Sequence, residues 1–290
     1  MKTSGAALVM DLGGTGSRAL LEIGNESRRS EAPCGNPNRV GAKAVEACIF
    51  DLLVGVEAAG RTLDRAVVGM AGASHPEARI LVRRAFERAG VLVGAAWFMN
   101  DAELAHCAAF PGPEVPGVLV VAGTGSIAVA RGAGGAFVRA GGKGPAVGDE
   151  GSGHWIGTRL LEASLRDPAL ATEIARRLGE GASTGPPSAV AAVLDALVTD
   201  FPAAAAVAEG AGEALADLAT EARRLSATAS PSVRCSGSVL LRSGAVRTAF
   251  RRRLAERGEG AFDHGDVEDV LVAGLDWLRS APIFGVPPRW

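Results

Sequence analysis

The chain has 290 residues, of which 48% are hydrophobic and 21% charged, with aromatic residues at only 4% and no tyrosine. This composition excludes a disordered chain and indicates an α/β protein with a core built mainly of Ala, Val and Leu, and the length predicts two domains at about 150 residues each. The net charge of −2 provides no broad positive field, so neither nucleic acid nor a membrane surface is an expected partner.

Apolar runs alternate with amphipathic stretches through the first part of the chain. We expect strands at residues 6–10, 18–23, 66–70 and 95–99, and helices at residues 40–59, 77–89 and 102–109. Strands that alternate with helices predict a sheet that is covered by helices.

The segment PGPEVPG at residues 111–117 contains three prolines and two glycines and is the strongest linker signal in the chain. We therefore predict an N-terminal domain of residues 1–113 and a C-terminal domain of residues 114–290, and leave open a return of the last helix to the N-terminal domain. In the second half we expect strands at residues 118–121, 127–130, 137–140 and 232–236, mainly helices over 154–227, and a last helix at 267–280.

The most basic stretch is VRTAFRRRLAER at residues 246–257. Val246, Phe250 and Leu254 recur at helical spacing, with arginines between them. This pattern predicts one amphipathic helix with a solvated, arginine-rich face rather than a binding patch.

Targeting and metal-binding signals are weak. The apolar run at residues 6–10 is too short for the hydrophobic region of a signal peptide, and no run approaches the roughly 18 apolar residues of a membrane span. The four cysteines are scattered without a CxxC pair, which indicates reduced thiols and no structural zinc. We therefore expect a cytoplasmic protein.

The tetrapeptide Gly-Thr-Gly-Ser occurs twice between apolar runs, in ALVMDLGGTGSRALL at residues 7–21 and in VLVVAGTGSIAVA at residues 118–130. A hairpin turn rich in Gly and Thr can point backbone N–H groups and a hydroxyl into one concavity that suits phosphate oxygens. Either copy alone is equally a plain hairpin turn. Two copies at equivalent places favour a pair of turns that hold the β- and γ-phosphates of a nucleotide across a cleft.

Acidic residues stand at two positions suited to catalysis or binding. Asp101 follows an apolar run and precedes a short predicted helix, so it lies at the carboxyl end of a strand, where open α/β sheets bind ligands. The same position also suits the N-cap of that helix. Asp149 and Glu150 precede the helix expected near residue 154. As an alternative to binding, they can simply be acidic residues that stabilise the first turn of that helix.

The order of these motifs resembles the N-acetylglucosamine kinases and the related BadF/BadG-type ATPases of the actin-like sugar kinase superfamily. The resemblance rests on DLGGTGS at residues 11–17, NDA at 100–102, AGTGS at 122–126 and GGKGPAVGDEGSGHWIG at 141–157, with SGSVLL at 236–241 as a weaker adenosine motif. It covers about residues 6 to 275. It implies an α/β fold of two duplicated ribonuclease H-like domains, with ATP and sugar bound in the cleft between them.

The resemblance also implies a nucleotide site that uses ATP and Mg²⁺. Asp11 would organise Mg²⁺ through its water shell, and Gly237 and Ser238 would lie near adenosine. The residues that would line the phosphates are Gly13, Gly14, Thr15, Gly123, Thr124 and Gly125. Without the resemblance, Gly237 and Ser238 would be read as a strand-to-helix turn.

For the sugar, the resemblance implies that Asp101 is the catalytic base and that Asp149 binds sugar hydroxyls. The other residues implied to contact the sugar are Asn36, Ser74, Thr124 and Glu150. Asn36 beside Pro37 is also explained by turn chemistry alone.

The expected activity is the phosphorylation of N-acetylglucosamine, a small-molecule substrate, at its 6-hydroxyl. Ile127 replaces an Asn that contacts the sugar in the animal enzymes, and loss of a polar partner can change selectivity strongly. Glucosamine and N-acetylmuramic acid are therefore alternative acceptors. An iron–sulfur activator ATPase and a catalytically silent sugar sensor are the rival functions, and a homodimer is left open.

Overall fold

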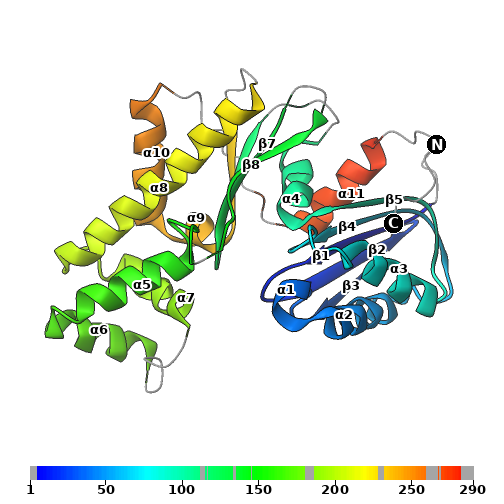
Figure 1. The fold of residues 1–290 in the computed structure, drawn as a ribbon, viewed down its shortest axis with the longest axis horizontal. Helices are drawn as coiled ribbons and strands as arrows, with labels where there is room; N and C mark the ends of the chain where they lie inside the picture. Colours follow the sequence, from blue (N-terminus) through cyan, green and yellow to red (C-terminus); the bar gives the residue numbers. More distant parts are fainter. Residues whose placement is uncertain are drawn as a thin grey trace. The chain divides into compact units, whose positions relative to one another are not determined.

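A computed structural model describes residues 5–111, 115, 117–132, 135–144, 146–179, 186–227, 232–258, 267 and 269–281. The chain forms two compact units (Figure 1). Unit 1 comprises Met1–Val115 and Val267–Trp290, and unit 2 comprises Pro116–Asp266. The division falls inside the Pro- and Gly-rich segment, and Val267–Trp290 is grouped with unit 1.

Unit 1 contains a five-stranded sheet in the order β3-β2-β1-β4-β5. Its strands are β1 (Ala6–Leu12), β2 (Ser17–Ile23), β3 (Glu26–Ala32), β4 (Thr62–Met70) and β5 (Leu92–Asn100). Strands β1, β4 and β5 are parallel, whereas β2 is antiparallel to both β1 and β3. Strand β3, with the sequence ESRRSEA, was not expected, because its charged residues show no apolar alternation. It forms by pairing with β2 along its whole length.

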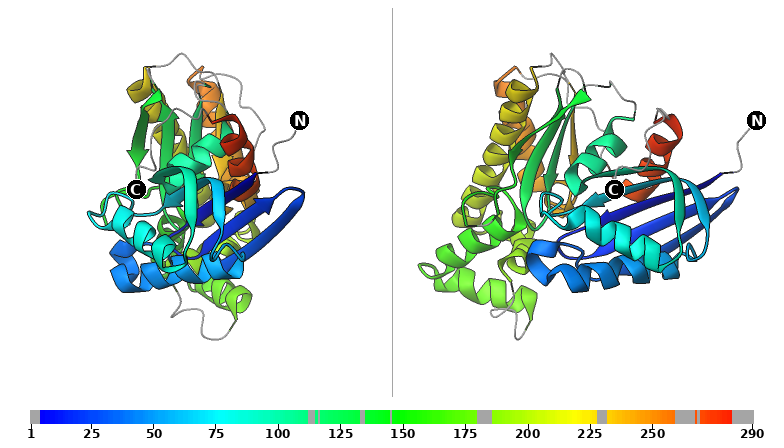
Figure 2. Two further views of the ribbon diagram at one scale, coloured as in Figure 1. Left: turned by 90° about the vertical axis from the view of Figure 1, so that its right-hand side faces the viewer. Right: turned by 45° about the vertical axis from the view of Figure 1, so that its right-hand side comes forward.

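Helices cover both faces of this sheet (Figure 1 and Figure 2). The helices of unit 1 are α1 (Pro37–Val40), α2 (Ala42–Gly55), α3 (Ala78–Arg88), α4 (Asp101–Ala109) and α11 (Val270–Ser280). Leu8 and Met10 of β1 belong to the core that α2 and α3 cover. Val9 points to the other face, where a Cβ built at Gly274 of α11 would lie 2.9 Å from it. The helix expected at residues 40–59 corresponds to α2, which begins after Gly41 (φ 79°) and ends at Gly55.

Polar contacts fix α11 to the sheet of unit 1. Arg279 donates to Glu22 of β2 at 2.6 Å. Arg65 of β4 donates to the carbonyl oxygens of Leu278 and, at 3.1 Å, of Ala281. The last helix of the chain is therefore part of the first unit.

Unit 2 contains a four-stranded sheet in the order β8-β7-β6-β9. Its strands are β6 (Val118–Ala122), β7 (Ser126–Arg131), β8 (Phe137–Gly141) and β9 (Val233–Ser236). Strands β6, β7 and β8 form an antiparallel meander, and β9 is parallel to β6. This is the arrangement of β1, β2, β3 and β4 in unit 1, so the duplication expected from the repeated tetrapeptide is present in the strand order.

The helices of unit 2 are α5 (Gly153–Ser164), α6 (Pro168–Leu178), α7 (Pro187–Val190), α8 (Pro202–Ser226), α9 (Ser238–Arg242) and α10 (Gly244–Glu256), with a 3-10 helix η3 (Ala191–Ala196). The long helix α8 packs on β6, β7 and β8, and α10 packs on α8. Gly212 permits this last contact, because a Cβ there would lie 2.5 Å from that of Ala249. No helix among the described residues has the length and hydrophobicity needed to cross a bilayer.

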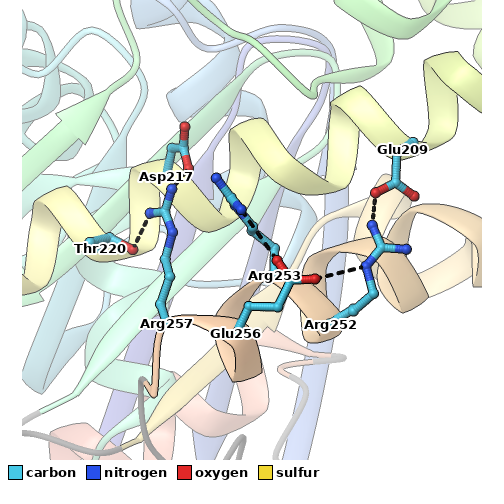
Figure 3. A network of polar contacts seen from close by, with 7 residues as sticks. All are labelled: Glu209, Asp217, Thr220, Arg252, Arg253, Glu256 and Arg257. Atoms are coloured by element: carbon cyan, nitrogen blue, oxygen red, sulfur yellow. Dashed lines mark hydrogen bonds and ion pairs between the residues drawn. The ribbon is translucent and has the colours of Figure 1, made fainter.

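The arginine-rich helix α10 carries ion pairs on its polar face (Figure 3). Arg257 pairs with Asp217 of α8 and donates to Thr220 at 2.8 Å. Arg252 pairs with Glu209 of α8, and also with Glu256 of its own helix at 3.4 Å. Such exposed pairs typically contribute up to about 1 kcal/mol each. These arginines therefore have acidic partners within unit 2.

Candidate active site

The first glycine-rich turn joins β1 to β2 in unit 1. The Gly13 N–H donates to the Gly16 carbonyl at 3.1 Å and closes the turn. The Gly35 N–H donates to the Gly13 carbonyl at 3.1 Å, which ties the turn to the segment after β3. Thr15 is exposed at the tip. The residues expected to line phosphates from this unit, Gly13, Gly14 and Thr15, thus form one open turn.

Two carboxylates lie at the edge of the sheet where this turn begins. The register places Leu12 opposite Met70 and Met70 opposite Asn100, so β1, β4 and β5 end together. Asp11 and Asp101 are therefore at the same edge. Burial and, after it, the negative charge of Asp11 raise the pKa of Asp101 to about 6. A carboxyl group with this pKa can accept a proton near neutral pH.

At the start of α4, Asn100 and Asp101 have different roles. Asn100 is the N-cap, since its side chain accepts from the Ala102 N–H at 3.0 Å. Glu103 completes a capping box by accepting from the Asn100 N–H at 3.0 Å. Asp101 is the first residue of the helix, so the capping role considered for it belongs to Asn100.

Asp11 is the carboxylate available to Mg²⁺ beside the first turn. Its Oδ2 accepts from Arg18 at 2.6 Å, which leaves Oδ1 for other ligands. Within the described residues no group of three or more His, Cys, Asp or Glu side chains could hold a metal ion. Mg²⁺ at nucleotide sites is usually held by one or two carboxylates, phosphate oxygens and water. A single carboxylate next to a phosphate-type turn fits that mode of binding.

The segment expected to contact the sugar lies against the loop that follows β4. The Asn36 Oδ1 accepts from the Asn38 N–H at 2.9 Å and caps α1. A Cβ built at Gly72 would lie 2.6 Å from that oxygen, so the loop passes directly beside Asn36. Ser74 is exposed two residues further along the loop. In unit 1, Asn36 therefore lies beside the loop that contains Ser74.

The second glycine-rich turn, between β6 and β7 in unit 2, is bonded to the GDEGSG segment. The Gly123 N–H donates to the Gly125 carbonyl at 2.9 Å and closes the turn. The N–H groups of Gly153 and His154, at the start of α5, donate to the carbonyls of Gly123 at 2.7 Å and Thr124 at 3.2 Å. Backbone hydrogen bonds thus hold the second turn against the start of α5.

Asp149 supports this second turn. It is buried, with a left-handed φ of 61°. A Cβ built at Gly125 would lie 2.8 Å from its Oδ2. Burial raises its pKa, although hydrogen bonds from the backbone of Ser126 and Gly144 favour the ionised form. The neighbouring Glu150 is exposed, and its carbonyl accepts from the Ser126 hydroxyl at 2.8 Å.

A cavity of about 430 Å³ lies within unit 2 beside the second turn. Its size falls in the range of small-molecule sites. Gly123, Thr124 and Ser238 were expected near a ligand and line it. Its other lining residues are Gly153, Ile156, Ser188, Ala189, Ala191, Ala192, Leu194, Asp195, Val239, Arg242 and Ser243. The polar residues among these stand in Ala-rich or helix-capping segments, where sequence alone gives them no functional signal.

Gly237 positions one wall of the cavity without lining it. It has a φ of 87°, and a Cβ there would lie 2.5 Å from the Ala122 carbonyl oxygen. Only glycine allows β9 to turn into α9 so close to the end of β6. Ser238, the next residue, lines the cavity.

Two sheets of the same strand order, each with a glycine-rich turn after its first strand, define the actin-like ATPase and sugar kinase fold. The "putative N-acetylglucosamine kinase" of Chromobacterium violaceum has this fold, with a TM-score of 0.68 and 22% identity over 94% of this chain and 99% of that one. A ROK family glucokinase from Streptomyces griseus, solved with glucose and AMPPNP, matches with a TM-score of 0.60 and 18% identity over 96% and 100% of the two chains. The expected fold class is confirmed.

The chain belongs to the BadF/BadG/BcrA/BcrD ATPase family, whose model matches residues 8–262. This confirms the family indicated by the motifs. The N-acetylmuramic acid/N-acetylglucosamine kinase of Clostridium acetobutylicum is 36% identical over 99 residues. That alignment covers 34% of this chain and 31% of the relative, so it spans about a third of the relative's length.

Proposed function

We propose that the protein transfers the γ-phosphoryl group of ATP to the 6-hydroxyl of an amino sugar, with N-acetylglucosamine as the first candidate acceptor. The observation that carries this proposal is the placement of Asp101. It stands at the end of parallel strands, beside Asp11 and the first glycine turn, with its pKa raised to about 6. Family membership supports the use of ATP.

In the proposed reaction, Asp101 accepts the proton of the sugar hydroxyl while that oxygen bonds to the γ-phosphorus. The bond from this phosphorus to the β–γ bridging oxygen breaks, and ADP leaves. Backbone N–H groups of both glycine turns would bind the phosphates, and Asp11 would hold Mg²⁺ through water. The metal would supply neutralisation of phosphate charge.

The proposed sugar contacts are Asn36, Ser74, Asp149 and Glu150. Ile127 supports the alternative acceptors glucosamine and N-acetylmuramic acid. Its side chain is apolar and lies against Gly142, where a built Cβ would be 2.7 Å from Ile127 Cδ1. A site without the amide of an Asn at this position has one polar partner fewer for a 2-acetamido group.

The direct test is ADP release from Mg-ATP in the presence of N-acetylglucosamine, glucosamine, N-acetylmuramic acid, N-acetylmannosamine or glucose. We expect an amino sugar to accelerate ADP release and the product to carry phosphate on its 6-oxygen. ATP binding without acceleration by any of these sugars would instead support a silent sensor.

The iron–sulfur alternative receives no support from the cysteines. Cys107 and Cys235 are completely buried. Thiolates that share a cluster between subunits must reach the surface.

The pH dependence of the reaction follows from the raised pKa of Asp101. The base must be ionised, so we expect kcat/KM to fall as the pH drops through about 6, the pKa that burial and Asp11 produce. The measurement is kcat/KM for the preferred sugar from about one pH unit below that midpoint to about two units above it. A profile that is flat down to pH 5 would remove Asp101 as the titrating base.

Asp195 is expected to shape the nucleotide pocket. It accepts from the Ser243 hydroxyl, and from the Gly244 N–H at 2.6 Å and the Ala245 N–H at 3.4 Å, so it ties η3 to the start of α10. Asp195→Ala should raise the KM for ATP about 5- to 10-fold, equivalent to about 1 kcal/mol, with little change in kcat. Asp217→Ala, which breaks only an exposed pair with Arg257, is the matched control. An equal KM in both variants would contradict this role.

A further inference from the structure

Arg39 places a guanidinium group against the first glycine turn. It lies on α1, and its Nη1 donates to the Gly14 carbonyl oxygen. A Cβ built at Gly14 would lie 3.7 Å from the same nitrogen. The side chain is otherwise exposed. The tip of the turn therefore has a cation beside it that no motif indicated.

The backbone holds Arg39 in this position. The Gly35 N–H donates to the Gly13 carbonyl at 3.1 Å, so the segment before α1 is bonded to the turn itself. The Asn36 side chain caps α1, and the Arg39 N–H donates to the Asn36 carbonyl at 3.0 Å. The guanidinium thus approaches Gly14 from a segment that is already attached to the same turn.

The charge of Arg39 is not neutralised by its surroundings. In the part of the chain that the structure describes, no carboxylate lies within ion-pair distance of it. Arg18, the other arginine near the turn, differs because it pairs with Asp11 at 2.6 Å. Since arginine stays protonated, a full positive charge remains at a turn that is shaped to bind phosphate. Only Nη1 is engaged, which leaves the Nη2 edge for a ligand.

We propose that Arg39 contacts the phosphoryl group while it is transferred, an inference that rests on the proposed function. In that step negative charge spreads over the three equatorial oxygens of the γ-phosphoryl group. A planar guanidinium can donate to two of those oxygens at once. Arg39 thereby stabilises the transition state more than it stabilises bound ATP. Asp101 has the separate role of accepting the proton of the sugar hydroxyl.

The test compares Arg39→Ala and Arg39→Lys with Arg61→Ala. Arg61 is the matched control, because it is exposed and its Nε donates to the Glu57 carbonyl at 2.6 Å. We expect R39A to lower kcat about 10²-fold or more, with unchanged affinity for Mg-ADP and unchanged melting temperature. Binding of Mg-ADP with aluminium fluoride, which mimics the transferring group, should weaken in parallel with kcat. R39K should recover part of the loss, added guanidinium should partly rescue R39A, and R61A should match the wild type.

The outcomes separate this inference from the proposed function. A wild-type enzyme that phosphorylates no sugar overturns both. An active wild type with an equally active R39A overturns the role of Arg39 alone. Equal losses of kcat, Mg-ADP affinity and melting temperature would show that Arg39 only supports the turn. A loss confined to N-acetylmuramic acid would show that it binds the carboxylate of that sugar instead of phosphate.

Discussion

Asp101→Asn should lower kcat by about 10²–10⁴ and leave the protein folded, because the variant retains the shape of the side chain but not its ability to take a proton. The amide oxygen can still accept from the Ala102 N–H, as the Asp101 carboxylate does at 3.0 Å. The capping of α4 is unaffected, since Asn100 and Glu103 provide it. A steady-state or stopped-flow assay of ADP release with the preferred sugar measures the change in kcat.

The same variant tests the electrostatics of the site. Folding raises the pKa of Asp101 to about 6, mainly through burial and then through Asp11. The folded state therefore favours the protonated form, and the stability due to this group is lost as the pH rises through about 6. The Asp101→Asn variant lacks the titrating carboxyl group and should not show this pH-dependent loss of stability. At pH values above about 6 its melting temperature should therefore be no lower than that of the wild type. Asp51→Asn, on the exposed face of α2, is the control. A folded Asp101→Asn enzyme with a near-normal rate would exclude Asp101 from the mechanism.

Gly157→Ala should destabilise unit 2 by about 3 kcal/mol and weaken nucleotide binding. A Cβ at Gly157 of α5 would lie 3.0 Å from the Pro187 Cα and closer still to its carbonyl carbon and oxygen. Main-chain atoms cannot rotate away, so α5 and α7 must separate. Because α5 and α7 both line the cavity, through Ile156 and Ser188, the affinity for Mg-ADP should fall as well.

Chemical unfolding and calorimetric titration with Mg-ADP measure the two effects of Gly157→Ala. Gly210→Ala makes the same change in α8, where the new methyl group would meet only the ring edge of Trp155 at 3.3 Å. That control should be neutral or stabilising, since alanine favours a helix by up to about 1 kcal/mol over glycine. Equal stability of the two variants would show that the contact between α5 and α7 can relax.

Most of the fold follows from the sequence because the periodicity of apolar residues reflects burial. Both hairpins and their glycine turns were predicted in this way. Strand β3 could not be, since ESRRSEA has no apolar alternation and depends on β2 for its backbone partners. The Ala-rich stretch around η3 suggested an α-helix, but Ala191–Ala196 forms 3-10 turns.

A candidate site can be predicted where a local motif carries the proposed chemistry. Asp11, Asp101 and the residues of both turns stand inside such motifs. The roles proposed for Arg39 and Asp195 could not be predicted, because they rest on hydrogen bonds to groups 25 and 48 residues away in the chain. The N-cap role considered for Asp101 belongs to Asn100, because that role depends on side-chain geometry.

The position of α11 has a consequence for the order of folding. Unit 1 needs this helix to cover the face of its sheet that bears Val9, yet α11 is translated only after the whole of unit 2. During synthesis on the ribosome, the nascent first unit has only α4 on that face while the inserted unit emerges and folds. The apolar part of the face that α11 covers should therefore be most exposed before this helix is synthesised.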